Sequence, residues 1–426
     1  MVLGILKRSR RAFMAAAFLF VALPLVVYTT SLSPPLARTG AFGEPTCVDC
    51  HTGTALNGGE GSVTIGAPTF YAPGTTAPIT VTIQDSSSDR RKWGFELSVR
   101  FQNGRQAGSF TATAPVDVQT SAAGIQYALH HPAQSGTGNK FIYTLNWAAP
   151  ADASGGNVVF SAVANAANGD LSSAGDHIYT NQLEVTVPTG AARVSGGGVV
   201  NAATFVAAPN NTIAPGALIS IFGAGLASMT GAATALPLPT TLAGSQVTIG
   251  GVAAPLIYVS PTQINAQAPF ELATGAKLNV VVKIPGLPDS AAEPVQVDAA
   301  SPGIFTVTQS GIGAGTILHA SYSAVNSSSV ARPGETVLIY CTGLGATTPA
   351  VRTGGAGNGE RTVNLPTVSI GGQNARVDFS GAAPGFAGLY QINTVVPAFT
   401  TAGDYEVVIT IASRQSRSGV TMRVQP

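Results

Sequence analysis

The sequence predicts an all-β chain with three immunoglobulin-like β-sandwich domains in series after an N-terminal export signal. Turn-forming residues are abundant, with 50 Gly and 28 Pro among 426 residues. Between them, Val, Ile, Thr and Phe recur in short runs, and no long apolar stripe with the helical period of 3.6 follows the N-terminus. The length beyond the export signal corresponds to about three domains.

Residues 1–37 are expected to be a signal peptide or a membrane anchor. Lys7, Arg8, Arg10 and Arg11 precede an almost wholly apolar run, residues 13–28. That run is short for a membrane span, which needs about 20 residues. The rest of the chain is therefore expected to be extracytoplasmic, in the periplasm, at the cell surface or secreted. It would contact the membrane only through this segment, if the segment stays uncleaved.

Residues 38–188 show the period of two that is typical of strands. Apolar residues alternate with polar ones from Trp93 to Phe101, which predicts a half-buried strand with one face on the core. Similar patterns predict strands at 79–83, 141–147, 158–164 and 183–187. These patterns suffice for a seven-strand sandwich.

A C-x-x-C-H motif, Cys47, Cys50 and His51, opens this domain. Two thiols at this spacing can form thioethers with the two vinyl groups of a haem, and the adjacent His can bind the iron axially. The motif therefore predicts a covalent haem c. Two alternatives stay open: a disulfide or redox pair, which an exported chain favours, and a zinc site. A zinc site usually has a second ligand pair, whereas the sequence has only one further cysteine, Cys341.

Histidines are the candidates for a sixth iron ligand. His130 and His177 lie in the same domain as His51, whereas the nearest methionines, Met14 and Met229, lie outside it. The predicted metal ligands are therefore His51, His177 and His130. The alternatives are a five-coordinate iron, and surface or hydrogen-bonded histidines with no ligand role.

Several segments of this domain resemble bacterial Reeler-like domains of the choice-of-anchor type. The resembling segments are residues 38–51, 91–97, 165–169 and 175–180, which include the C-x-x-C-H motif. The resemblance covers roughly residues 38–188. It implies an extracytoplasmic β-sandwich with no defined substrate, and it places His130 and His177 at positions that match the family.

An internal repeat follows an expected linker at 189–198. Residues 215–226 echo 333–344, 247–251 echo 368–372, and Gln-Ile-Asn recurs at 263–265 and 391–393. We therefore expect two immunoglobulin-like domains, at 199–300 and 301–426, with the Gly-Gly pairs in hairpin turns. Cys341 is expected to be a buried core residue. The Gln-Ile-Asn segments form either a binding strip or strands whose amides hold neighbouring loops.

The tandem resembles a C-terminal domain family of acidobacterial secreted proteins. The resembling residues are 200–203, the two Pro-Gly-led segments, 258–265 and 385–393. That family has no established enzymatic role, and its form implies adhesion, display or assembly outside the cell.

Composition and motifs narrow the function. The net charge of +1 gives no field that would attract nucleic acid. No G-x-S-x-G, H-E-x-x-H, P-loop or dinucleotide motif occurs, so no enzyme is expected. The main hypothesis is an exported mono-haem c-type protein that transfers electrons to a redox partner or senses a ligand. The alternative is a non-enzymatic adhesion or structural protein that contacts an extracellular surface component, with the C-x-x-C as a disulfide or vestige. A carbohydrate-binding module is a third option.

Overall fold

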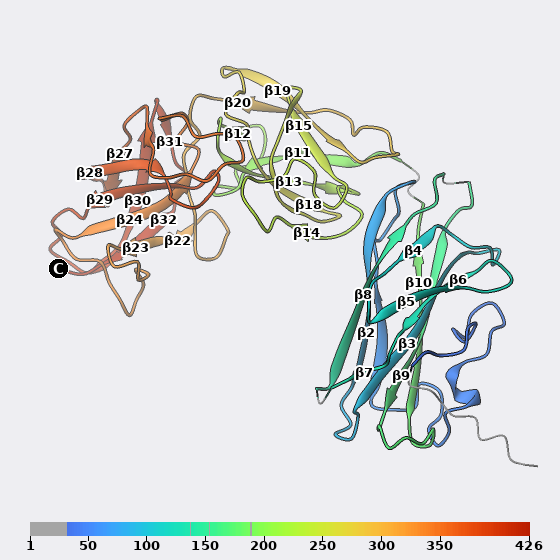
Figure 1. The fold of residues 1–426 in the computed structure, drawn as a ribbon. Helices are drawn as coiled ribbons and strands as arrows, with labels where there is room; N and C mark the ends of the chain where they lie inside the picture. The colour runs from blue at the N-terminus through green and yellow to red at the C-terminus, as the bar shows by residue number, and fades with distance from the viewer. Residues whose placement is uncertain (1–31, 137, 153, 188–189) are drawn as a thin grey trace, which may run out of the picture.

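Figure 1 shows the computed structural model, which describes residues 32–136, 138–152, 154–187 and 190–426. Within these ranges the regular elements are strands and one short 3-10 helix, η1 (Cys47–Asp49). The predicted all-β class is confirmed. Most of the expected signal or anchor lies outside the described residues, and no helix among those described is long and apolar enough to cross a membrane.

The first unit has two antiparallel sheets that face each other (Figure 1). One has the strand order β1-β2-β8-β4, and the other has the order β10-β9-β3-β6-β5, with β7 beside β3. The strands are β1 (Gly61–Gly66), β2 (Thr76–Asp85), β3 (Lys92–Phe101), β4 (Ser109–Thr111), β5 (Val116–Thr120), β6 (Gln126–His130), β7 (Gln134–Ser135), β8 (Lys140–Ala148), β9 (Val158–Ala167) and β10 (His177–Val185). The five predicted patterns fall on β2, β3, β8, β9 and β10, although the last runs two residues beyond the end of β10. Strands β1 and β4 to β7 were not predicted.

Strand β3 is buried on both faces, which the alternating pattern did not predict. Its aromatic and aliphatic residues pack in the core between the sheets, as expected. On the other face, however, Glu96 and Ser98 are fully buried and Arg100 is 5% exposed. The cover comes from the segment that precedes β1, because Leu36 and Ala37 pack against this side of the sheet.

The second unit also has two sheets. Their strand orders are β11-β13-β18-β17-β14 and β12-β20-β19-β15-β16, with β12 parallel to β20. The strands are β11 (Arg193–Asn201), β12 (Thr212–Ile213), β13 (Leu218–Ala224), β14 (Gly231–Ala232), β15 (Gln246–Ile249), β16 (Val252–Ala253), β17 (Leu256–Val259), β18 (Gln263–Gln267), β19 (Ala276–Lys283) and β20 (Glu293–Val297).

Strand β11 begins inside the segment that was expected to be a linker. Its pairing with β13 shifts register between Val194 and Val199, where three consecutive glycines, residues 196–198, lie. Glycines accommodate such an irregularity in a strand, so a glycine-rich stretch that reads as a linker forms a bulged edge strand here.

The third unit repeats this plan with a continuous ladder, β21-β24-β29-β28-β27-β30-β32-β22. Strand β28 joins its two layers, because residues 373–375 pair with β27 and residues 376–382 pair with β29, with a register shift between Val377 and Phe379. The strands are β21 (Gly303–Ile304), β22 (Gly313–Ala314), β23 (Ile317–His319), β24 (Thr336–Thr342), β25 (Thr347–Thr348), β26 (Arg361–Thr362), β27 (Thr367–Ile370), β28 (Gln373–Ala382), β29 (Tyr390–Val395), β30 (Gly403–Ile411), β31 (Arg414–Gln415) and β32 (Val420–Val424).

The internal repeat is a structural repeat. Ile221 pairs with Ile264 between β13 and β18, and Ile339 pairs with Ile392 between β24 and β29. The Gly-Gly pairs at 250–251 and 371–372 all have positive φ, between 56° and 84°, as tight hairpins of the I′ type require. Cys341 is fully buried in the third core, as expected.

Candidate functional site at the C-x-x-C-H segment

The C-x-x-C-H motif lies in the segment that covers the outer face of the sheet around β3. A buried carboxylate holds the start of this segment, because Glu96 accepts the backbone N–H groups of Ala37 and Arg38 at 2.9 and 2.7 Å. Burial raises the pKa of Glu96 to about 7, although these two hydrogen bonds act in the opposite direction.

A second carboxylate, Glu44, points from the segment onto the same face of the sheet. It accepts hydrogen bonds from the Thr39 hydroxyl, from Tyr127 and from the Arg100 guanidinium. Burial alone would raise the pKa of Glu44, but these hydrogen bonds and the Arg100 charge outweigh it, so the pKa lies below its usual value. The polar residues of β3 are thus the anchors of the segment.

The two thiols of the motif lie in different surroundings. Cys47 is partly buried, and the desolvation of its thiol, together with the nearby Glu96 carboxylate, raises its pKa to about 12. Cys50 is exposed. The Cys50 N–H donates to the Cys47 carbonyl at 3.1 Å, and the His51 N–H donates to the same carbonyl at 2.8 Å. The motif therefore forms a tight turn with one thiol facing protein and the other facing solvent.

His51 is held by two residues of the sheet and its loop. Its Nδ1 lies 2.7 Å from the Oδ2 atom of Asp176, which is 2% exposed. The Asn165 Nδ2 lies 3.2 Å from Nδ1 and 3.4 Å from Nε2 of the ring. The backbone supports this contact, because the Thr52 N–H donates to the Ser173 carbonyl at 2.9 Å. The imidazole is thus fixed against strand β9.

His130 lies on the same side as His51. It is 9% exposed, and the Phe95 N–H donates to its Nδ1 at 2.9 Å. Gly94 makes room for the ring, since a Cβ there would lie 2.8 Å from Cε1. Burial, with smaller contributions from His131 and His51, lowers the pKa of His130 to about 4, so the ring is neutral at pH 7.

His177 lies on the other face of the sheet. It pairs with Ala166, a residue of the core, whereas His51 contacts the residue before Ala166. Successive side chains of a strand point to opposite faces, so the sheet separates the two histidines. The His177 Nδ1 lies 2.7 Å from the Asp85 carboxylate, which also accepts the Tyr179 hydroxyl at 2.6 Å. The structure therefore brings His130, but not His177, to the side of the motif.

The two thiols would have to change position before a haem could join them. A haem edge needs both thiols on one side, whereas Cys47 faces protein and Cys50 faces solvent. The Asn165 amide lies beside the Nε2 of His51, the ring nitrogen left over by the contact with Asp176. Within the described residues, no group of three or more His, Cys, Asp and Glu side chains is placed to hold a metal ion.

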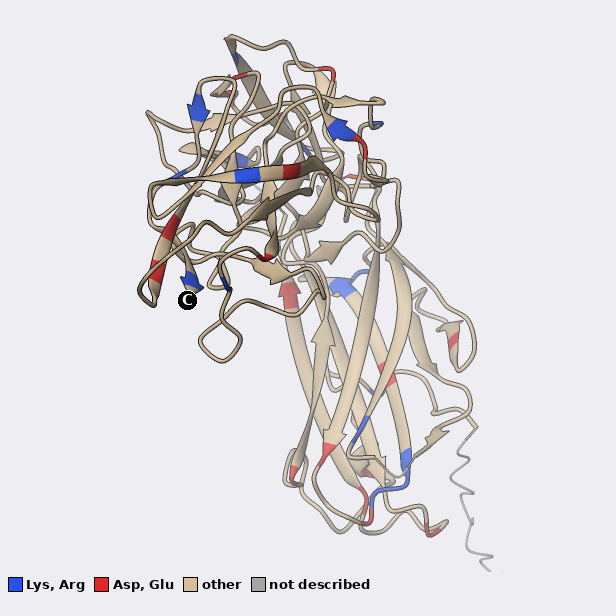
Figure 2. Cartoon of the chain, turned by 90° about the vertical axis from the view of Figure 1, so that its left-hand side faces the viewer, with Lys and Arg blue, Asp and Glu red and all other residues tan. Residues whose placement is uncertain are grey.

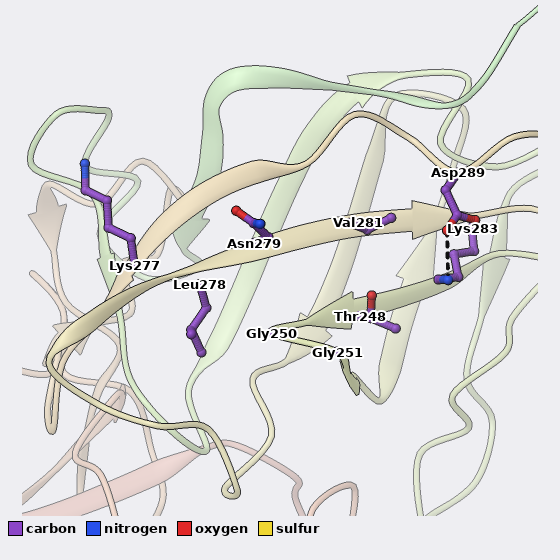
Figure 3. A pocket seen from close by; sticks show the side chains of 9 residues that line it. All are labelled: Thr248, Gly250, Gly251, Lys277, Leu278, Asn279, Val281, Lys283 and Asp289. Carbon is purple, nitrogen blue, oxygen red and sulfur yellow. Dashed lines mark ion pairs between the residues drawn. The ribbon is translucent and has the colours of Figure 1, made fainter.

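A groove with a volume of about 370 Å³ lies on the second unit, away from the motif (Figure 3). The Gly250-Gly251 hairpin and strand β19 form it, and an ion pair of 2.8 Å between Lys283 and Asp289 closes one end. Sequence analysis did not identify this groove. The Gly-Gly hairpin was its only signal, and a hairpin alone indicates a turn.

The comparisons with known proteins match one unit to a family. Residues 207–298 match the family model of the IPT/TIG domain. No curated protein matches the chain. Among solved structures, the chain is similar to the reeler domain of human F-spondin, with 20% identity and a TM-score of 0.23, over 32% of this chain and 94% of that chain.

Two further solved structures are similar over most of this chain. One is the Bacteroides ovatus mixed-linkage glucan utilization locus SGBP-B in complex with a mixed-linkage heptasaccharide, with 11% identity and a TM-score of 0.25, over 92% of this chain and 69% of that chain. The other is the I9–I11 tandem of titin, with 7% identity and a TM-score of 0.17, over 85% of this chain and 98% of that chain. The IPT/TIG match lies in the second unit, and it confirms the immunoglobulin-like fold expected there.

Proposed function

We propose that this chain is a non-enzymatic, extracytoplasmic structural protein that displays its first unit on a stiff support of two immunoglobulin-like units. The observation that carries the proposal is that both junctions between units are closed by direct packing and hydrogen bonds. A chain of separately moving domains would instead have exposed, flexible linkers with few contacts across them.

The first junction is apolar. Phe70 and Ala72 follow strand β1 of the first unit, but their side chains belong to the core of the second unit. The Thr69 N–H donates to the Ser228 carbonyl at 2.8 Å, also across the junction. The first unit thus contacts the second through this segment as well as through the chain that continues into β11.

The second junction is polar and buried. The Asn201 side-chain amide donates to the Ser301 carbonyl at 2.8 Å, and the Leu218 N–H donates to the Thr342 hydroxyl at 2.8 Å. The Gly354 N–H donates to the buried Gln267 side chain at 2.6 Å. Removing one partner of such a buried bond leaves a polar group unsatisfied, so these bonds favour a single orientation.

The surface charge supports a structural role. Figure 2 shows Lys and Arg scattered along the chain among Asp and Glu, rather than gathered over one surface. With a net charge of +1, the protein has no strong field for recruiting a highly charged partner.

Display is tested on intact cells that produce the full chain. A membrane-impermeant amine reagent is expected to label Lys140, which is exposed in the first unit, and Lys277 of the second unit, without cell lysis. A cytoplasmic protein in the same cells serves as the control for lysis. Labelling that appears only after the cytoplasmic membrane is broken would refute the extracytoplasmic location.

The covalent haem c predicted from Cys47, Cys50 and His51 stays a prediction, with a direct test. The protein is purified from a host with haem-attachment machinery, and a pyridine haemochrome spectrum is recorded after acid–acetone extraction. A Soret band that survives extraction would show covalent haem, and the segment around the motif would then pack differently from the arrangement described above. Colourless protein favours the structural role.

A further inference from the structure

The Cys47–Cys50 turn combines the geometry of a disulfide with an unequal exposure of its two sulfurs. We propose that this pair is a thiol–disulfide exchange site, in which the exposed Cys50 reacts first with an external disulfide and the sheltered Cys47 then closes the intramolecular bond. The site is additional to the display function, and it does not require a bound metal or haem.

The backbone already holds the two residues at the required separation. The hydrogen bond of 3.1 Å from the Cys50 N–H to the Cys47 carbonyl closes a four-residue turn. The Cα atoms at the ends of such a turn lie within about 7 Å of each other. Disulfides span Cα separations of about 4.4 to 6.8 Å, so rotation of the side chains suffices to join the sulfurs.

The order of reaction follows from the surroundings of each sulfur. The thiolate is the attacking form, and an external disulfide must also reach it. Cys50 is exposed, whereas Cys47 is partly buried. Cys47 therefore reacts poorly with a molecule in solution. Once Cys50 carries a mixed disulfide, however, the attack by Cys47 is intramolecular, and proximity offsets its limited access to solution.

The two steps balance. The Cys50 thiolate attacks an external disulfide RSSR, so that a Cys50–S–S–R bond forms and one RS⁻ leaves. The Cys47 sulfur then attacks the Cys50 sulfur, the Cys47–Cys50 bond forms and the second RS⁻ leaves. The protons of the two protein thiols end on two RSH molecules. Two cysteines are oxidised by two electrons in total, and one RSSR is reduced.

Cys341 provides an internal reference. It is fully buried in strand β24 of the third unit, far along the chain from the pair, and burial raises the pKa of its thiol. It is therefore expected to stay reduced and unmodified in the native protein under the same conditions.

The test treats the reduced, full-length mature protein with oxidised glutathione and follows intact mass and peptide maps. The wild type is expected to lose two hydrogens without retaining glutathione, with the new bond between Cys47 and Cys50. The variant Cys47→Ser is expected to trap glutathione on Cys50. The variant Cys50→Ser is expected to react at least about tenfold more slowly with glutathione than Cys47→Ser does, because its remaining thiol, Cys47, is sheltered.

Three results would overturn the proposal: a wild type that retains a stable glutathione adduct, equal reaction rates for the two variants, or thiols blocked as thioethers. The wild-type peptide map decides the pairing even where a variant folds poorly. A near-ultraviolet circular dichroism spectrum, in which buried Trp93 and Trp147 contribute, verifies that each variant is native.

Discussion

Glu96 and His130 are buried ionisable residues beneath the same segment, and their pKa values move in opposite directions. Burial raises the pKa of the Glu96 carboxyl to about 7 and lowers that of the His130 imidazole to about 4. In both cases burial disfavours the charged form. Each residue therefore makes stability depend on pH, and the two effects oppose each other in mildly acidic solution.

Replacing His130 is expected to flatten the loss of stability in acid. The unfolded imidazole binds a proton near pH 6.5 and the folded one near 4, so the stabilisation is present above pH 6.5 and is lost as the pH falls towards 4. The difference corresponds to about 3 kcal/mol at most. When the free energy of unfolding is measured in urea between pH 4 and 7, His130→Asn is expected to remove this part of its dependence on pH. A slope that stays as steep in His130→Asn would show that burial does not shift the titration of this imidazole.

Replacing Glu96 is expected to have the opposite effect on the slope. Its folded pKa of about 7 exceeds the ordinary value of 4.5, so its contribution is fully present below pH 4.5 and is lost as the pH rises through 7. Glu96→Gln removes that decline, but it also costs about 1–3 kcal/mol throughout, because one of the two backbone donors loses its acceptor. An unchanged pH slope in the same unfolding series would contradict the assigned pKa.

Single residues were predicted from the sequence where chemistry depends on spacing alone. The C-x-x-C-H motif is of this kind, whereas the burial of Cys341 was expected from its place in a repeated strand. The surroundings of the motif were not predictable, because Glu96, Asn165 and Asp176 reach it from a sheet that is distant in sequence. In particular, alternation within a strand does not reveal that His51 and His177 lie on opposite faces.

At the scale of elements, strands were easier to predict than what covers them. The alternation from Trp93 to Phe101 identified β3, but its polar face was expected to meet solvent. A segment without any periodicity buries that face, and no pattern in the sequence predicts that this segment packs there. The stretch from Gly196 to Gly198 was wrongly expected to be a linker for a related reason, because glycines are common in both bulged strands and linkers.

The Gly-Gly hairpins permit a matched test within one turn. Gly371 and Gly372 both have positive φ, so an alanine at either position costs about 1–2 kcal/mol of backbone strain. A Cβ on Gly371 would lie 2.5 Å from Tyr405 Cδ1, within the stacked Tyr405–Phe399 pair, whereas a Cβ on Gly372 meets nothing within 4 Å. Gly371→Ala is therefore expected to destabilise more than Gly372→Ala in thermal unfolding. Equal losses of stability in the two variants would show that the aromatic pair can move aside without cost.

At the scale of the whole molecule, the all-β class and the repeated plan of the second and third units followed from composition and internal repeats. The junctions did not, because their contacts join residues far apart in sequence, such as Asn201 and Ser301. Phe70 packs in the core of the neighbouring unit, and no periodic pattern in the sequence predicts this contact.

Phe70 is the residue with which the first junction can be loosened. It is 8% exposed and packs in the second core, and a buried Phe→Ala change typically costs about 3–5 kcal/mol. Phe70→Ala is expected to separate the unfolding of the first unit from that of the other two in calorimetry. Phe386→Ala, at a side chain that is 57% exposed, is the control and leaves a single transition.

Small-angle X-ray scattering of the purified protein tests the central claim, that the three units form one stiff body. The account predicts that the scattering curve of the wild type fits the single arrangement in Figure 1, and that Phe70→Ala broadens the distribution of interatomic distances. A wild-type curve that fits only a mixture of many relative orientations of the units would contradict it.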